Sequence, residues 1–124
     1  MNVKEIYEQA REQLSVNVES MNALRIIHYS IMRVKILNED REEKAYTAEF
    51  DFSELSFLFH GFYNTPEKMD KLVEELAGCM VKINNEGNVQ EVSLYKDVHY
   101  SNEVLYVTFS DEIGPNMEYP DGNA

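Results

Sequence analysis

Apolar side chains recur at helical spacing over two stretches near the start of the chain. Residues 2–13 carry a narrow apolar face, whereas residues 20–36 carry a broad one. The broad face consists of Leu24, Ile27, Ile31 and Val34, and it is widened by Ile26, Met32 and Ile36. An apolar face of this width predicts a helix that is buried on more than one side.

A strand pattern then gives way to a helix start signal. Residues 46–50 alternate between apolar and polar side chains, which predicts a half-buried strand. Asp51 and Glu54 have the spacing of a helix capping box, so we expect a short helix over 52–59. Gly61 follows this helix and suits the left-handed conformation in which many helices end.

A second helix start signal is the Thr-Pro dipeptide at 65–66. Thr is a common N-cap residue and Pro a common first helical residue, so we expect a helix over 66–78. The pattern then changes to that of strands and predicts an antiparallel sheet over 80–109, with one long strand at 89–100. Gly87 marks the turn that precedes this long strand.

The order of these elements predicts the fold class. Helix, helix, strand, helix, helix and then strands is the order of a winged helix, an α+β fold in which a helix-turn-helix precedes a β-hairpin wing. We therefore expect one winged-helix domain over 1–110, with the segment NNEGN at 84–88 as the tip of the wing. Residues 111–124 are acidic and rich in Pro, Gly and Asn, so we expect an irregular tail there.

The charge balance of the chain is strongly acidic. Its 124 residues include 11 Lys and Arg against 23 Asp and Glu, which gives a formal net charge of -12. A chain of this length is expected to form one domain. Because an acidic surface is repelled by phosphate backbones and by anionic membranes, we expect weak or no DNA binding and no membrane partner.

The cysteine usage and the hydropathy favour a cytoplasmic location. Cys79 is the only cysteine, so the chain cannot form an intrachain disulfide, and its place in the apolar run LAGCMVKI predicts a buried core residue. No apolar stretch approaches the roughly 20 residues of a membrane helix. The charged amino-terminal segment does not have the pattern of a signal peptide.

No motif in the sequence points to catalysis, to a cofactor or to a metal. His28, His60 and His99 are spread along the chain, and neither HxxxH nor CxxC spacing occurs. Phosphate-binding glycine motifs and a nucleophile elbow are also missing from the sequence. We therefore predict a protein that is not an enzyme and that binds no cofactor.

The surfaces that a winged helix offers to DNA are acidic in this chain. We predict a partner-binding acidic face made of Glu67, Asp70, Glu74, Glu75 and Glu86. The residues that suit phosphate contacts are Lys68, Lys71 and Arg25. The alternative for helix 66–78 is a solvated face with ion pairs between Glu67 and Lys71 and between Lys71 and Glu75.

Aromatic residues gather around the short helix at 52–59. Four of them are candidates for an interface, namely Phe57, Phe59, Phe62 and Tyr63. The alternative is core packing, and the sequence leaves both open.

Four segments of the chain together resemble the N-terminal winged-helix domain of plasmid replication initiator proteins, the type that acts on iteron repeats in theta replication. These segments are ALRIIHYSIMRVK, FDFSELSFLF, NTPEKMDKLVEELAGCMVKI and EVLYVTFSDEIGPNM. The resemblance extends from Ala23 to Met117 and rests on apolar and helix-capping positions. It implies a winged-helix module and a homodimer. In that family a second winged-helix domain reads most of the specific bases.

Two functional hypotheses follow. The first is a non-enzymatic winged-helix module that acts by dimerisation or protein contacts in the replication or control system of a plasmid or other mobile element. The second is an acidic inhibitor of phage type, such as an anti-defence or anti-CRISPR protein. Its carboxylates would imitate DNA and occupy a basic groove of a nucleic-acid-binding protein.

Overall fold

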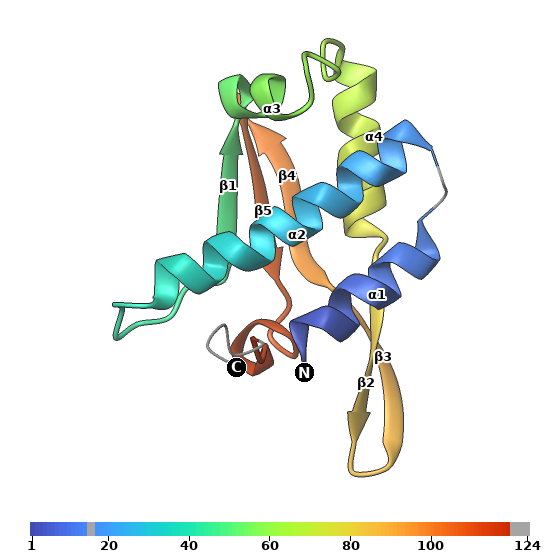
Figure 1. The fold of residues 1–124 in the computed structure, drawn as a ribbon, viewed down its shortest axis with the longest axis vertical. Helices are drawn as coiled ribbons and strands as arrows, with labels where there is room; N and C mark the ends of the chain where they lie inside the picture. The colour runs from blue at the N-terminus through green and yellow to red at the C-terminus, as the bar shows by residue number, and fades with distance from the viewer. Residues whose placement is uncertain (15–16, 120–124) are drawn as a thin grey trace.

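The fold is known from a computed structural model that describes residues 1–14 and 17–119 (Figure 1). Its helices are α1 (Val3–Gln13), α2 (Val18–Asn38), α3 (Phe52–Leu58) and α4 (Pro66–Ala77). Its strands are β1 (Thr47–Asp51), β2 (Met80–Asn85), β3 (Asn88–Ser93), β4 (Tyr95–Ser101) and β5 (Val104–Phe109), and a 3-10 turn follows at Gly114–Asn116. The expected α+β class is confirmed.

The strands form two separate antiparallel sheets. One has three strands in the order β1-β5-β4, and the other is the β2–β3 hairpin. Figure 1 shows α2 crossing in front of the three-stranded sheet. The hairpin extends from one end of the molecule, and α3 lies at the other end. The predicted hairpin turn is confirmed, since Glu86 and Gly87 both have positive φ values. The hairpin does not, however, belong to the three-stranded sheet.

The expected single strand over 89–100 is wrong, because the chain changes sheets at Leu94. The Leu94 N–H donates to the Cys79 carbonyl at 2.9 Å, and its carbonyl accepts from the Ser110 N–H at 3.0 Å. Leu94 and Tyr95 are both buried, although neighbouring residues of one continuous strand would face opposite sides of a sheet. Burying both side chains therefore requires the bend that separates β3 from β4.

The helix start and stop signals are confirmed. Asp51 caps α3 by accepting from the Glu54 N–H at 2.8 Å, and Thr65 caps α4 by accepting from the Lys68 N–H at 3.4 Å. The capping box at α3 is incomplete, because the Glu54 carboxylate pairs with Arg33 of α2 instead of reaching back. At the end of α3 the Gly61 N–H donates to the Ser56 carbonyl at 2.8 Å, the bond of a Schellman motif.

The apolar face of α2 is narrower in the structure than the sequence pattern predicts. Ile26, Ile27 and Ile31 are buried in the core, but Met32 and Ile36 are exposed. Helix α2 packs against α1, α4 and β1, as the predicted burial on more than one side requires. Its remaining side presents apolar side chains to solvent.

Two glutamines of α1 pair with the outer edge of β2. The Gln9 amide accepts from the Lys82 N–H at 2.6 Å and donates to the Lys82 carbonyl at 3.2 Å. The Gln13 amide accepts from the Met80 N–H at 2.8 Å and also donates to the Met80 carbonyl. Side chains of a helix thus occupy the edge that another strand would otherwise pair with.

Residues 111–119 consist of turns, one 3-10 turn and an isolated bridge, and they pack on the body of the protein. Ile113 is fully buried, and the Tyr119 hydroxyl donates to the Ile31 carbonyl at 3.3 Å. The backbone of Glu118 bonds to Met1 and Val3 on both sides of Asn2. The rest of the predicted tail, 120–124, lies outside the described residues.

Candidate functional site

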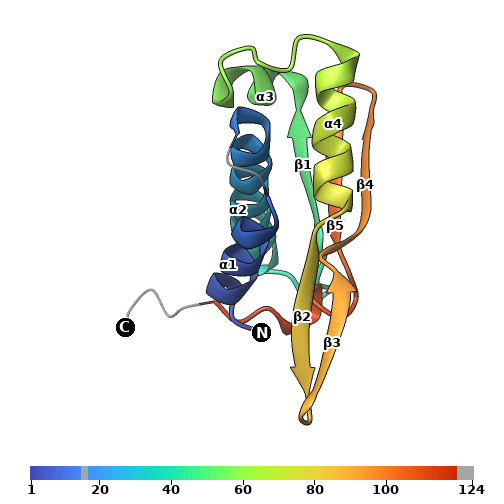
Figure 2. The ribbon, with the colours of Figure 1, turned by 90° about the vertical axis from the view of Figure 1, so that its right-hand side faces the viewer.

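Three of the five predicted acidic residues lie together on α4. Glu67, Asp70 and Glu74 are exposed, and intervals of three and four residues place them along one side of the helix. Glu75 faces inward, where its carboxylate accepts from the Ser20 hydroxyl at 3.1 Å and its second oxygen is buried. Glu86 occupies the tip of the β2–β3 hairpin, which Figure 2 shows extending away from α4. The five residues therefore do not form one face.

The predicted phosphate-contacting residues lie on two different helices. On α4, the Lys68 ammonium donates to the Asn64 amide oxygen at 3.1 Å and lies 4.7 Å from the centre of the Phe62 ring. Lys71 is exposed. The ion pairs among the described residues do not include Lys71, so the pairs with Glu67 and Glu75 that a solvated face would have do not form. Arg25 lies on α2. The three cations therefore do not come from one helix.

The four candidate interface aromatics divide between core and surface. Phe59 and Tyr63 are buried and pack edge to face at 5.5 Å, and Phe62 packs edge to face on Tyr63. Phe57 is 82% exposed. Core packing is therefore the outcome for Phe59 and Tyr63, whereas Phe57 remains available on the surface of α3.

A groove of about 470 Å³ lies between α1 and α2. Its apolar lining comes from Val3 and Tyr7 on α1 and from Tyr29 and Met32 on α2. The exposed apolar residues of α2 continue this surface beyond the groove, since Ile36 follows Met32 by four residues and is 62% exposed. This is the apolar surface that the narrower burial of α2 leaves open.

Two cations and one histidine also line the groove. They are Lys4 on α1 and Arg25 and His28 on α2. The His28 ring lies 6.0 Å from the Tyr7 ring across the groove. The Arg25 guanidinium lies 5.0 Å from the centre of the Phe59 ring, and one of its nitrogens donates to the Tyr29 hydroxyl at 3.4 Å.

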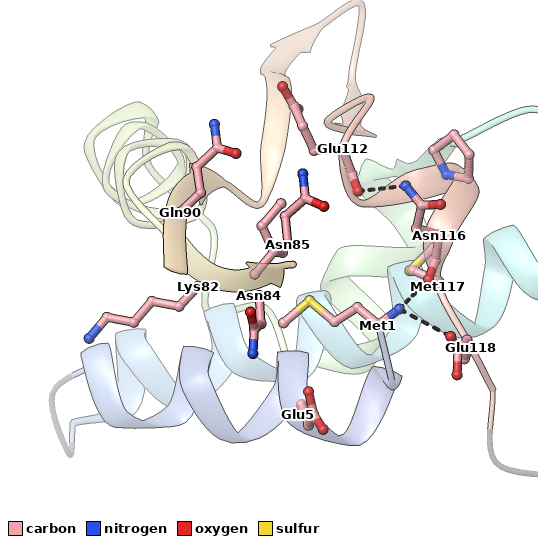
Figure 3. A pocket seen from close by; sticks show the side chains of 12 residues that line it. Met1, Glu5, Lys82, Asn84, Asn85, Gln90, Glu112, Asn116, Met117 and Glu118 are labelled. Atoms are coloured by element: carbon pink, nitrogen blue, oxygen red, sulfur yellow. Dashed lines mark hydrogen bonds and ion pairs between the residues drawn. The ribbon is translucent and has the colours of Figure 1, made fainter. Parts of the chain in front are cut away.

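A second, polar cleft lies where α1, the β2–β3 hairpin and the carboxyl-terminal segment meet (Figure 3). Side-chain amides of Asn84, Asn85, Gln90 and Asn116 surround it. The Met1 ammonium donates to the Asn116 carbonyl and lies 3.6 Å from the Glu118 carboxylate. These contacts neutralise the Met1 ammonium and join the two ends of the described chain.

The structure bears on two candidate chemistries, metal binding and a reactive thiol. Within residues 1–14 and 17–119, no group of three or more His, Cys, Asp and Glu is placed to hold a metal ion. Cys79 is buried, and burial raises the pKa of its thiol from 9.0 to about 11. Such a thiol stays protonated and unreactive at neutral pH.

None of the described helices has the length and apolar character needed to cross a membrane. Comparisons with family models, with curated proteins and with solved structures gave no match to this chain.

The groove was missed by reasoning from the sequence, although a signal exists. Residues 20–38 contain no acidic side chain, in a chain with 23 of them. They contain Arg25, His28, Arg33 and Lys35 instead. A basic helix in an acidic chain, with more apolar residues than one buried face can use, indicates an exposed functional surface.

Proposed function

We propose that this protein is a non-enzymatic winged-helix module that acts by binding other proteins, with weak or no DNA binding of its own. The observation that carries the proposal is the α1–α2 groove, which combines an exposed apolar lining with basic side chains in a chain of net charge -12. Contiguous exposed apolar surface is typical of protein interaction sites. The setting that the family resemblance implies, the replication or control system of a plasmid or other mobile element, is part of this proposal.

The strand order supports the winged-helix part of the proposal. In this interpretation α2, α3 and α4 are the three helices, and β1-β5-β4 is the accompanying sheet. The β4–β5 hairpin, with its turn at Asn102 and Glu103, then takes the place of the wing. The β2–β3 hairpin is an addition between α4 and this sheet, so NNEGN is not the tip of the wing in this assignment.

The charges on α4 support weak or absent DNA binding. If α4 entered a DNA groove, Glu67, Asp70 and Glu74 would face the phosphates beside Lys68 and Lys71. Affinity for DNA grows with the number of phosphates that cations neutralise, and two cations beside three carboxylates neutralise few. We expect a Kd of roughly 10⁻⁴ M or weaker at physiological salt.

Fluorescence anisotropy with labelled duplex DNA tests this part of the proposal. We expect no saturable binding at micromolar protein. The control is a variant with Glu67→Gln, Asp70→Asn and Glu74→Gln, which removes three acidic charges from α4 and should bind DNA more tightly than the unmodified protein. Nanomolar DNA binding by the unmodified protein, lost in Lys68→Ala and Lys71→Ala, would overturn the proposal.

Self-association is a further part of the proposal, with α3 as its surface. Phe57 is largely exposed, and Phe52 at the start of α3 is 38% exposed. Light scattering over a concentration series should give a homodimer mass at micromolar concentration, and Phe57→Ser should shift it to the monomer. Monomer mass at all concentrations would exclude this homodimer.

The acidic-inhibitor hypothesis is favoured by one observation, the line of exposed carboxylates on α4 (Glu67, Asp70 and Glu74). A DNA mimic should displace duplex DNA from a basic DNA-binding protein. The variant with all three carboxylates replaced by amides should then lose this activity, whereas Met32→Asp in the groove should keep it. If the protein instead binds its partner through the groove, Met32→Asp should lose partner binding and the variant with three amides should keep it.

A further inference from the structure

The basic side chains of α2 do not all serve the same purpose. Arg33 makes a two-pronged ion pair with Glu54 and lies 4.1 Å from the centre of the Phe50 ring, so it joins α2 to β1 and α3. Lys35 lies 5.7 Å from the centre of the Tyr119 ring. Both residues are thus engaged with other parts of the fold. Arg25 also contacts another ring, that of Phe59 at 5.0 Å, but Arg25 and His28 line the groove, and Arg33 and Lys35 do not.

Apolar and basic residues follow one line along the exposed side of α2. The line consists of Met21, Arg25, His28, Met32 and Ile36, at intervals of three and four residues. Met21 and Ile36 are 56% and 62% exposed. Fifteen residue steps at 1.5 Å give this line a length of about 22 Å, which matches about four turns of a second helix.

We infer that the α1–α2 groove binds an amphipathic helix of another protein whose apolar face is flanked by carboxylates. This inference rests on the proposed function and specifies the chemistry of the partner. The apolar lining gives the partner's apolar side chains a surface to bury against, as in other helix-in-groove interactions. Lys4 and Arg25 line the groove, and the lining contains no acidic residue, so acidic side chains beside that apolar face find complementary charge.

A second copy of this chain fits the groove less well. A symmetric dimer through α2 would bring Arg25 toward the same residue of the other copy, and like charges across an interface oppose binding. The acidic side of α4 offers carboxylates, but the exposed large apolar residues of the described chain do not lie on α4. Neither arrangement supplies apolar and acidic groups together.

Nucleic acid and membrane fit less well for other reasons. The apolar part of the lining, with valine, isoleucine and methionine, offers no donor to a phosphate backbone, and the net charge of -12 repels that backbone. An anionic membrane would attract Lys4 and Arg25 but would be repelled by the net charge of -12. The site is also a concave groove between two helices, which suits an inserted helix better than a flat lipid surface.

The test uses two labelled helical peptides with the same apolar stripe, one flanked by Glu and the other by Lys. Anisotropy with the intact protein at about 150 mM salt should show saturable binding of the Glu peptide and roughly tenfold weaker binding of the Lys peptide. NMR spectra should show shifts of the Met32 methyl group and of the Tyr7 and Tyr29 rings on addition of the Glu peptide. Equal binding of both peptides would overturn the inferred partner charge.

Matched variants separate local from global charge. Arg25→Glu and Lys71→Glu each change the net charge by the same amount, one at the groove and the other on α4. We expect Arg25→Glu to weaken Glu-peptide binding roughly tenfold and Lys71→Glu to leave it unchanged. Because Arg25 also contacts Phe59, Lys4→Glu serves as a second groove variant, and thermal unfolding verifies that each variant folds. Equal effects of the groove and α4 variants would overturn the inference.

The remaining outcomes distinguish this inference from the proposed function. If both peptides bind and Met32→Asp abolishes binding, protein binding at the groove stands and only the acidic partner is wrong. If neither peptide binds, the groove is not a helix-binding site, and the proposed protein-binding function loses the observation that carries it. A self-associated species that Met32→Asp dissociates, or tighter binding to phosphatidylserine vesicles than to the Glu peptide, would replace the inferred partner with a second copy or a membrane.

Discussion

The pairing of Gln9 and Gln13 with the edge of β2 leads to a residue-specific prediction. Replacing Gln9 with Ala removes both hydrogen bonds to Lys82, and replacing Gln13 removes both to Met80. A net hydrogen bond contributes about 0.5–1.5 kcal/mol, and exposed bonds belong at the low end of this range. Ordering a glutamine side chain costs part of this gain.

The expected loss in the free energy of unfolding is therefore about 0.5–1 kcal/mol for each substitution. The local effect should be larger than the global one. Hydrogen exchange measured by NMR should show the Lys82 amide losing protection in Gln9→Ala while the Met80 amide keeps it. In Gln13→Ala the Met80 amide should lose protection while the Lys82 amide keeps it. The reason is that Gln13 accepts from the Met80 N–H, whereas Gln9 accepts from the Lys82 N–H.

Gln90→Ala is the matched control, because Gln90 lies on the neighbouring strand β3 and is exposed. It should leave the exchange of both amides and the urea unfolding midpoint unchanged. If Gln9→Ala leaves the Lys82 amide as protected as in the unmodified protein, the glutamine is not what covers this edge. The same reasoning would then fail for Gln13.

Three further predictions concern stability. Thr65→Ala removes the N-cap of α4 and should cost about 1 kcal/mol in urea unfolding, whereas Ser at this position should restore most of it. Gly114→Ala should cost about 1–3 kcal/mol, because the added methyl group would lie 2.8 Å from the Tyr46 ring; a stability equal to that of the unmodified protein would show that the 111–119 segment can shift away. Cys79 should react with a thiol reagent at pH 8 only after unfolding. The pKa of its thiol is about 11 in the folded protein and about 9 in the unfolded protein. Its contribution to stability is therefore complete below pH 9 and is lost as the pH rises toward 11. Cys79→Ala should show a smaller fall in stability over that pH range.

Much of the fold is predictable because its signals are local. The strand at 47–51 ends at Asp51, and this residue caps the next helix with one short hydrogen bond. Thr65 and the proline after it mark the start of α4 in the same way. These signals involve residues within a few positions of one another, so a single sequence contains the whole interaction.

The errors arise where distant residues decide the structure. At Leu94 the chain leaves the hairpin because its backbone pairs with Cys79 on one side and Ser110 on the other, and neither contact has a pattern in the segment 89–100. The acid Glu75 has the helical position of an exposed residue, yet its carboxylate finds the Ser20 hydroxyl of α2. Periodicity gives the direction of a side chain around its helix, but it does not show what lies in that direction.

The groove could be predicted only in part for the same reason. The lack of acidic residues in 20–38 is visible in the sequence, but it does not show which apolar side chains remain uncovered. Met32 and Ile36 have apolar side chains at helical spacing, yet the packing of α1 on α2 leaves both exposed. The interaction surface is thus a property of how the two helices meet.

The net charge makes the response to salt a test of which surface is used. At about 10 mM salt, where the Debye length is about 30 Å, an acidic partner approaching the groove is repelled by the net charge of the whole protein. At about 150 mM, where the Debye length is about 8 Å, this repulsion is screened and the partner is attracted by Lys4 and Arg25 near contact. Raising the salt from about 10 to 150 mM should therefore increase its association rate, as measured by stopped-flow fluorescence with the Glu peptide. A basic partner of the carboxylates on α4 is attracted at long range, so its association rate should fall over the same range. A Glu-peptide association rate that falls steadily with salt would mean that charges near the groove outweigh the net charge of the protein, and that this distinction between the two surfaces fails.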